Sequence, residues 1–194
     1  MKKIKIQTKY KKLLADVYTP VGIYLRLRDR FRDTILLESS DFHAGENSYT
    51  FIGIHAIAGI EIKTASTIEY KLPAQNAESI KIITPSKVPE YFWDFMQRFD
   101  ISEVAPRPIN VAQGLFGYST YDAVQFFDTI KLTNNPQQAA SGIPLMRYRL
   151  YQYVIAINHF KNELFICENS IEGIDSEVEM IESLIRSKNV PAFP

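Results

Sequence analysis

The sequence has a single cysteine, only eight glycines and no long apolar run. Because Cys167 has no second thiol to pair with, an internal disulfide framework is excluded. No apolar stretch reaches the roughly 18 to 20 residues that a membrane-spanning helix needs. Met1-Lys2-Lys3 is followed by polar alternation and not by the apolar core of a signal peptide. The sequence therefore predicts a cytoplasmic protein with no membrane partner.

An excess of one charge is also missing. Lysine and arginine number 22 and so do aspartate and glutamate, among 194 residues. Nucleic-acid binding needs a basic face that neutralises phosphates, so we expect no nucleic-acid partner. The hydrophobic content of 46% is sufficient for a sizeable core. We therefore expect residues 1–194 to form one domain, or a large part of one.

Patterns typical of metal binding and covalent catalysis are absent as well. His43, His55 and His159 lack the spacing of a metal site, and we expect them on the surface or in turns. Cys167 lies in an apolar strand pattern, which predicts an inert buried thiol. Gly114-Leu-Phe-Gly117 lacks the Lys-Ser/Thr of a phosphate-binding loop, so these glycines are expected where a strand passes close to another. No catalytic residue or metal ligand is assigned.

Hydrophobic periodicity predicts an α+β fold with mostly antiparallel sheet and flanking helices. Strands are expected at residues 4–10, 34–40, 49–63, 67–72, 80–83, 111–118, 147–158 and 163–167. Helices are expected from Pro20 to about Phe31, from Pro89, from Ser119 to about Phe127, and after Asp175 or Ser176. Residues 133–141 are expected to form an exposed loop.

The predicted helices also suggest which residues face the core. Thr19 followed by Pro20 is typical of an N-cap and the first helical position. The inward residues of this first helix are expected to be Val21, Tyr24, Leu25 and Arg28. An apolar stripe in the second helix is expected from Phe92, Phe95, Met96 and Phe99. The last helix is expected to bury Val178, Ile181, Leu184 and Ile185, and Ser119 with Asp122 resembles a capping box.

Glu38 and Ser39 stand at the polar end of the apolar run 34–40, a strand expected to be covered on both faces. A carboxylate and a hydroxyl can together hold an ammonium group by charge-assisted hydrogen bonds. Adjacent side chains of an extended strand point to opposite faces. Both can therefore reach one ligand only if the strand ends or bends there, or if one contributes its backbone. The alternative is a solvated strand end at which Ser39 or Ser40 begins a turn.

Arg147 and Arg149 share one face of their predicted strand. Two guanidinium groups on one face could receive a carboxylate or a phosphate. An exposed face at the edge of a sheet is the alternative interpretation.

Three blocks of the sequence resemble a known family in order and spacing. They are Thr19-Pro20-Val21 with Tyr24-Leu25 and Leu27, then Leu36-Leu37-Glu38-Ser39, then Tyr49-Thr50-Phe51-Ile52-Gly53. These blocks resemble the N-terminal domain of anthranilate synthase component I, the large subunit. The resemblance continues through residues 114–118, 121–124 and 146–167, and so covers most of the chain. Ser48 stands where the family usually has arginine, and Gln113 replaces the first of a common glycine pair.

The resemblance implies a regulatory site and not a catalytic one. In that family the Leu-Leu-Glu-Ser segment lines a pocket for the feedback inhibitor L-tryptophan, so Leu37, Glu38 and Ser39 are expected to bind it. The family's Mg²⁺-binding glutamates and its catalytic residues lie in a C-terminal chorismate-binding domain, which we expect to be absent from residues 1–194. No cofactor is therefore expected in this segment, and the segment alone is expected to be inactive.

For the whole protein, the resemblance implies conversion of chorismate and ammonia to anthranilate and pyruvate in tryptophan biosynthesis. The ammonia would come from glutamine through a partner glutamine amidotransferase subunit, anthranilate synthase component II. Two alternatives remain open. One is the N-terminal domain of aminodeoxychorismate synthase component I, a branch that more often has aspartate at the position of Glu38. The other is a stand-alone small-molecule-binding or scaffolding domain.

Overall fold

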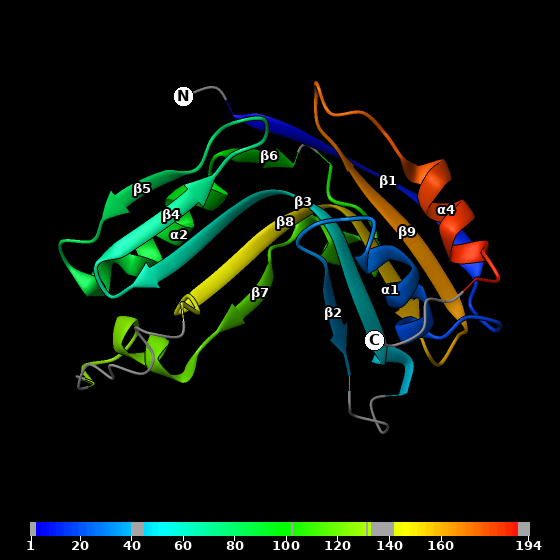
Figure 1. Cartoon of the computed structure of the whole chain (residues 1–194), viewed down its shortest axis with the longest axis horizontal. Helices are drawn as coiled ribbons and strands as arrows, with labels where there is room; N and C mark the ends of the chain where they lie inside the picture. Colours follow the sequence, from blue (N-terminus) through cyan, green and yellow to red (C-terminus); the bar gives the residue numbers. More distant parts are fainter. Residues whose placement is uncertain (1–2, 40–44, 102, 131, 133–141, 190–194) are drawn as a thin grey trace. The chain divides into compact units, whose positions relative to one another are not determined.

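The chain has an α+β fold with a mostly antiparallel sheet, in a computed structural model that describes residues 3–39, 45–101, 103–130, 132 and 142–189 (Figure 1). This confirms the predicted fold class at that level. Two compact units are formed. The first comprises Met1–Ile4, Ile57–Asp100 and Leu115–Leu150, and the second comprises Lys5–Ala56, Ile101–Gly114 and Tyr151–Pro194. The expected loop 133–141 and His43 lie outside the described residues.

Two long strands, β3 (Tyr49–Thr64) and β8 (Met146–Asn158), are neighbours in the sheet and contribute residues to both units. In the second unit the strand order is β2-β3-β8-β9-β1. The added strands are β2 (Ile35–Glu38), β9 (Glu163–Ser170) and β1 (Ile4–Leu14), each antiparallel to its neighbour. The predicted hairpin of β8 and β9 is confirmed, because two apolar segments joined by a short polar connection favour an antiparallel pair.

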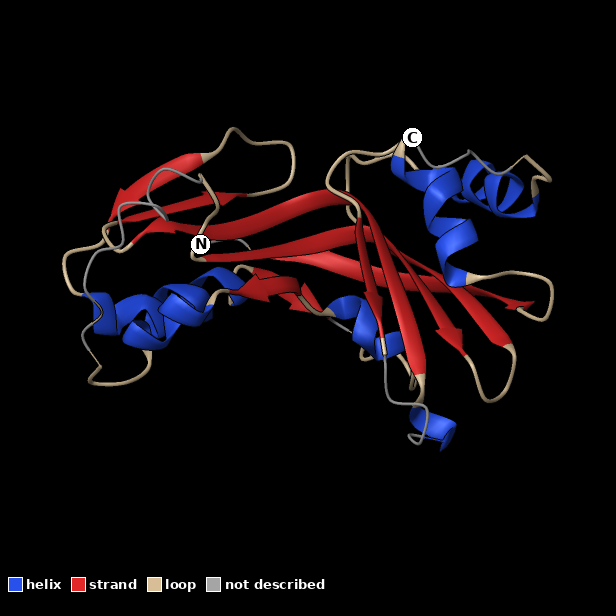
Figure 2. Ribbon diagram, turned by 60° about the horizontal axis from the view of Figure 1, so that its bottom comes forward, coloured by secondary structure: helices blue, strands red, loops and turns tan. Residues whose placement is uncertain are grey.

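Two helices pack on one face of the sheet in the second unit (Figure 2). They are α1 (Pro20–Arg28) and α4 (Val178–Arg186), which also contact each other. Their buried residues join apolar residues of β3, β8 and β9 in one core: Ile23, Leu27, Ile52, Ile54, Tyr153, Ile155, Leu164, Ile166, Ile181 and Ile185. Full burial of each such side chain contributes about 1.5–3 kcal/mol. Leu36 of β2 also packs against this core.

The predicted inward face of α1 is only partly correct. Leu25 is buried, but Val21 is exposed, and Ile23 and Leu27 are the residues buried in the core. The helix also ends at Arg28, earlier than expected. Apolar residues lie around most of this short helix, so spacing alone does not select the face that the sheet covers. For α4, the predicted burial of Ile181 and Ile185 is confirmed.

Thr19 caps α1 as the sequence predicts. Its Oγ1 accepts a hydrogen bond from the backbone N–H of Gly22 at 3.1 Å. Thr19→Ala is expected to lower the free energy of unfolding by about 1 kcal/mol, because a helix N–H loses its acceptor. Chemical denaturation measures this difference. Thr19→Ser retains the hydroxyl and should remain near the parent value, so an equal loss in both variants would contradict the capping role.

In the first unit the strand order is β5-β4-β3-β8-β7. The added strands are β4 (Thr67–Lys71), β5 (Glu78–Lys81) and β7 (Phe116–Ser119). Helix α2 (Val88–Met96) packs on one sheet face, where the Phe92 ring meets Tyr148 edge-on with centroids 5.5 Å apart. The 3-10 helix η2 (Pro85–Lys87) also belongs to this unit. The 3-10 helix η1 (Gly45–Asn47) belongs to the second unit, and the short strand β6 (Phe99–Ile101) is the neighbour of β1 in the sheet.

Several predicted details of the first unit and the adjoining segments are wrong. Residues 111–118 are not one strand, because the 3-10 helix η3 (Ile109–Gln113) precedes β7. Met96 is exposed and does not belong to the core stripe, whereas Phe95 is buried. The proposed capping box opens only the 3-10 helix η4 (Tyr121–Phe126), whose N-cap residue Thr120 makes no side-chain cap bond. A segment this short closes too few i to i−4 bonds to offset helix nucleation.

The N-cap of the last helix and the position of His55 also differ from expectation. Glu177 occupies the N-cap position of α4, in place of Asp175 or Ser176. His55 lies half-buried within β3, with a φ of 58°, and not in a turn. This left-handed backbone conformation is uncommon for a residue with a side chain, although histidine adopts it more often than most. Periodicity gives no signal for a single residue of this kind.

Candidate functional site

The predicted ligand residues lie where β2 ends beside β3. The two strands are antiparallel, with Leu37 opposite Phe51 and Glu38 opposite Thr50. Glu38 is the last residue of β2, and Ser39 follows it. Leu37, Glu38 and Ser39 are all exposed, so the expectation of a strand covered on both faces is wrong. The strand ends at Glu38, which meets the geometric condition under which Glu38 and Ser39 can reach one ligand.

An aromatic pair lies beside this strand end. Tyr49 and Phe51 stack with ring centroids 5.8 Å apart and an interplanar angle of 16°. Opposite residues of antiparallel strands share a face, so Leu37 lies on the same face as Phe51 and Tyr49. Gly53 continues this face, and a Cβ there would lie 2.7 Å from the Tyr151 ring. The absence of a side chain at Gly53 therefore lets an aromatic ring pack directly on the strand.

The opposite face of the same strand end is polar. Thr50 is fully buried, and its Oγ1 lies 2.7 Å from Nε2 of His159. The backbone N–H of His159 also donates to the carbonyl oxygen of Ser48 at 3.0 Å. These two bonds tie the turn between β8 and β9 to the beginning of β3. Glu38 lies opposite Thr50 and on the same face. Its carboxylate is therefore next to the hydrogen-bonded pair of Thr50 and His159.

Sequence reasoning selected only part of this strand-end site, which comprises Leu37, Glu38, Ser39, Tyr49 and Phe51. Tyr49 and Phe51 belong to one of the blocks that resemble the family, but the sequence alone assigns them no role. Their i, i+2 spacing in a strand is a usable signal, because it places both rings on one face. The bond between Thr50 and His159 has no such signal, since 109 residues separate the two.

A second polar cluster lies in the first unit around Glu61. Arg147 Nε donates to Oε1 of Glu61 at 2.8 Å, and Nη2 of Arg149 donates to the same oxygen. Lys63 Nζ lies 3.0 Å from the other oxygen of Glu61 and 3.3 Å from a carboxylate oxygen of Glu69. The two arginines do receive a carboxylate, but it belongs to the protein itself. The alternative of an exposed edge is wrong for Arg149, whose side chain is 16% exposed.

Neighbouring cations keep Glu61 ionised although only 4% of its side chain is exposed. Burial alone would raise its pKa. Hydrogen bonds from Lys63 and Arg149, together with the charges of Arg149 and Arg147, outweigh burial and hold the pKa of Glu61 below its ordinary value. The carboxylate therefore carries its charge at neutral pH and fixes the positions of the surrounding cations.

Cys167 is buried on β9, and burial raises the pKa of its thiol to about 12. The prediction of an inert thiol is confirmed, because the reactive thiolate is scarce at neutral pH. Within the described part of the chain, no group of three or more His, Cys, Asp or Glu residues could hold a metal ion. None of the helices in that part is both long and apolar enough to cross a membrane.

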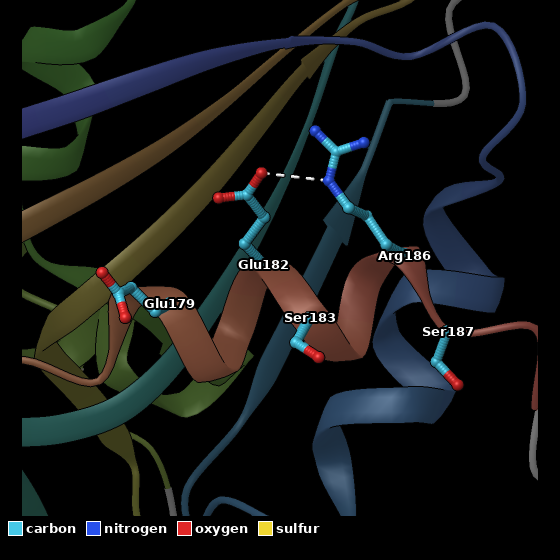
Figure 3. A pocket seen from close by; sticks show the side chains of 5 residues that line it. All are labelled: Glu179, Glu182, Ser183, Arg186 and Ser187. Carbon is cyan, nitrogen blue, oxygen red and sulfur yellow. Dashed lines mark hydrogen bonds and ion pairs between the residues drawn. The ribbon is translucent and has the colours of Figure 1, made fainter.

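A shallow depression on α4 is lined by Glu179, Glu182, Ser183, Arg186 and Ser187 (Figure 3). Arg186 Nε donates to Glu182 Oε1 at 3.0 Å, and Lys11 of β1 pairs with the other oxygen. The hydrogen bond from Lys11 holds the pKa of Glu182 below its ordinary value. All five lining residues come from one helix and its end, so the depression lacks the second wall that encloses a ligand.

Curated relatives match most of the chain. Anthranilate synthase component 1 of Acinetobacter calcoaceticus is 28% identical over 189 residues, which cover 91% of this chain and 36% of that protein. The protein of the same name from Aquifex aeolicus is 28% identical over 186 residues, with 91% and 34% covered. The one from Lactococcus lactis is 24% identical over 177 residues, with 91% and 35% covered. The chain resembles anthranilate synthase component 1.

The resemblance extends over nearly the whole chain but over little of each relative. The chain spans about a third of the length of the curated relatives it matches. Such coverage is consistent with an N-terminal-domain fragment of an anthranilate synthase component 1. No protein-family model matches the chain. These matches show what the chain as a whole is similar to. They do not test the roles of Leu37, Glu38 and Ser39, which stay a prediction.

Proposed function

We propose that this chain is the N-terminal regulatory part of an anthranilate synthase component 1 and that its strand-end site forms half of a feedback pocket for L-tryptophan. The whole protein would convert chorismate and ammonia to anthranilate and pyruvate. The observation that carries the pocket is the end of β2 at Glu38, beside the stacked rings of Tyr49 and Phe51. The anthranilate synthase relatives favour this function over the aminodeoxychorismate synthase and stand-alone alternatives.

The residues of the site suit the parts of a tryptophan molecule. The carboxylate of Glu38 can accept charge-assisted hydrogen bonds from an ammonium group, and the Ser39 hydroxyl can donate to a carboxylate. Leu37 and the Tyr49 and Phe51 rings offer an apolar surface on which an indole can stack. Because the strand pairing stops at Glu38, a ligand at this end can reach both sides of the strand.

Feedback would follow from coupling between this pocket and a chorismate site in a part of the protein outside this chain. An inhibitor lowers activity when it binds one arrangement of the protein more tightly than the arrangement that binds substrate. Within this proposal, the Mg²⁺ and the catalytic residues lie outside this chain, and ammonia comes from a glutamine amidotransferase subunit. We also place the protein in the cytoplasm.

A thermal-shift measurement on the full-length protein tests the pocket. L-Tryptophan at about 100 times its dissociation constant should stabilise the folded state by about 2.7 kcal/mol. Ser39→Arg should abolish this shift and relieve inhibition, because its bulk and charge occupy the end of β2 beside Glu38. Activity with and without tryptophan is measured on the same preparations.

Ser79→Arg provides the matched control, since Ser79 is an exposed serine on β5 in the other unit. It should keep the full response to tryptophan. If the Ser39→Arg protein stays as sensitive to tryptophan as the parent, the site assignment is wrong. A reading frame that encodes no chorismate-converting module would overturn the proposed function itself.

A further inference from the structure

The geometry points to a carboxylate-binding site at Arg147, in the first unit and separate from the strand-end site. The cationic cluster is defined as Lys63, Arg147 and Arg149, grouped around the buried carboxylate of Glu61. The proposed carboxylate site does not depend on the proposed function, because none of the residues of the cationic cluster contributes to the strand-end site.

The charges of this cluster do not balance. Three cations face two carboxylates, those of Glu61 and Glu69. Arg149 is the least exposed cation and bonds Glu61, while Lys63 lies between Glu61 and Glu69. The cluster therefore carries one net positive charge, and its most exposed cation is Arg147, whose side chain is 40% exposed. A single excess charge is matched by a monoanion, which favours a carboxylate over a dianionic phosphate.

Arg147 is held so that its binding edge is available. Its Nε donates to Glu61, and among the described residues nothing accepts a hydrogen bond from its two terminal nitrogens. These nitrogens form the planar edge that binds a carboxylate through two parallel hydrogen bonds. Since the Glu61 bond fixes the guanidinium before any ligand arrives, less side-chain entropy is lost on binding.

Neighbouring residues build the rest of the site. Gly59 leaves room for Arg149 to lie across β3, because a Cβ there would be 2.5 Å from Nη1 of Arg149. Arg149 can then donate to Glu61, and Arg147 needs only its Nε for the same carboxylate. The two terminal nitrogens of Arg147 are left for a ligand. Tyr118 of β7 lies directly opposite Arg147 and is 37% exposed. It supplies an aromatic surface for the apolar part of a carboxylate-bearing ligand.

The test is a titration of the ¹⁵N-labelled protein with sodium acetate at pH 7, with sodium chloride exchanged to keep ionic strength constant. The Nε–Hε signal of Arg147 and the amide signal of Tyr118 should shift saturably with acetate and remain unchanged in a chloride-only series. A second arm uses a blocked Gly-Glu-Gly peptide. Tighter binding of this peptide than of acetate identifies a protein side chain as the source of the carboxylate, and tighter acetate binding identifies a small molecule.

Arg147→Gln should weaken acetate binding by about tenfold or more, followed at the Tyr118 amide. Arg147→Lys keeps the charge but lacks the planar edge, so it should also bind more weakly than the parent. Arg186→Gln removes an exposed arginine of the other unit and should leave the titration unchanged. Absence of saturation, equal shifts with chloride, or full affinity in Arg147→Lys would overturn the site. Far-UV circular dichroism verifies folding, and Arg147→Lys serves if Arg147→Gln does not fold.

Discussion

Replacement of Glu61 by alanine is expected to lower the free energy of unfolding by about 3 kcal/mol. The substitution leaves the largely buried guanidinium of Arg149 without its carboxylate, and Arg147 and Lys63 lose their shared partner. Glu61 also lies directly opposite Glu69 on β4. Like charges in such a pair repel, and the three cations convert this repulsion into a stabilising network. Removal of Glu61 therefore leaves three clustered positive charges with only the partly exposed Glu69 to balance them.

Urea denaturation of the parent and variant proteins measures this effect. Glu69→Ala is the matched control, because Glu69 bonds the same Lys63 but is about one-third exposed. An exposed ion pair contributes roughly 0–1 kcal/mol, so this variant should lose no more than that. A similar loss in both variants would show that burial of Glu61 does not set the strength of the network.

The same network predicts how stability depends on pH. The pKa of Glu61 is below its ordinary value of 4.5 in the folded protein, because the hydrogen bonds and charges of its cationic partners outweigh burial. The unfolded state therefore takes up the proton first as the pH falls. The stabilisation is complete above about pH 4.5 and is lost as the pH falls through the lowered pKa. The Glu61→Ala protein should lack this part of the acid sensitivity, as thermal melts between neutral and acidic pH would measure.

Gly117→Ala is expected to destabilise the protein by roughly 2–3 kcal/mol. Gly117 lies on β7 opposite Tyr148, and a Cβ there would overlap the carbonyl group of Arg147. The clash involves backbone atoms, so no side-chain rotation relieves it, and β7 must separate from β8. The sequence-based expectation of close strand approach at this glycine is confirmed.

Gly114→Ala provides the comparison for this substitution. A Cβ at Gly114 would lie 3.2 Å from the carbonyl oxygen of Val111, which a small adjustment accommodates. Its effect should stay within about 1 kcal/mol. Thermal or chemical unfolding of the two variants measures the difference. If Gly117→Ala is as stable as Gly114→Ala, the close contact between β7 and Arg147 is not a constraint in solution.

Substitutions in the cationic cluster and substitutions at the strand-end site should have separable effects on ligand binding. Variants of Glu61 and Arg147 act in the first unit, whereas Ser39→Arg acts at the strand-end site in the second. Distant substitutions without shared partners add in free energy. Acetate binding at Arg147 should therefore persist in Ser39→Arg, and the tryptophan response should persist in Arg147→Lys. This separation distinguishes failure of the carboxylate site from failure of the proposed function.

The sequence by itself determined the features that depend on local pattern. Alternation predicted the first part of β1, apolar segments bounded by turn residues predicted β3, β8 and β9, and the Thr19-Pro20 pair predicted the start of α1. The apolar surroundings of Cys167 predicted a buried thiol. These features follow from side-chain direction and capping over a few residues, which the order of amino acids specifies directly.

Only the tertiary structure decided which distant residues meet. Arg147 reaches Glu61 across 86 residues of sequence, and His159 reaches Thr50 across 109. The buried face of α1 and the end of β2 at Glu38 were decided in the same way. Strand register and helix packing arise from the fit of whole surfaces, and a one-residue shift in register moves every side chain to the other face. Local periodicity does not contain that information.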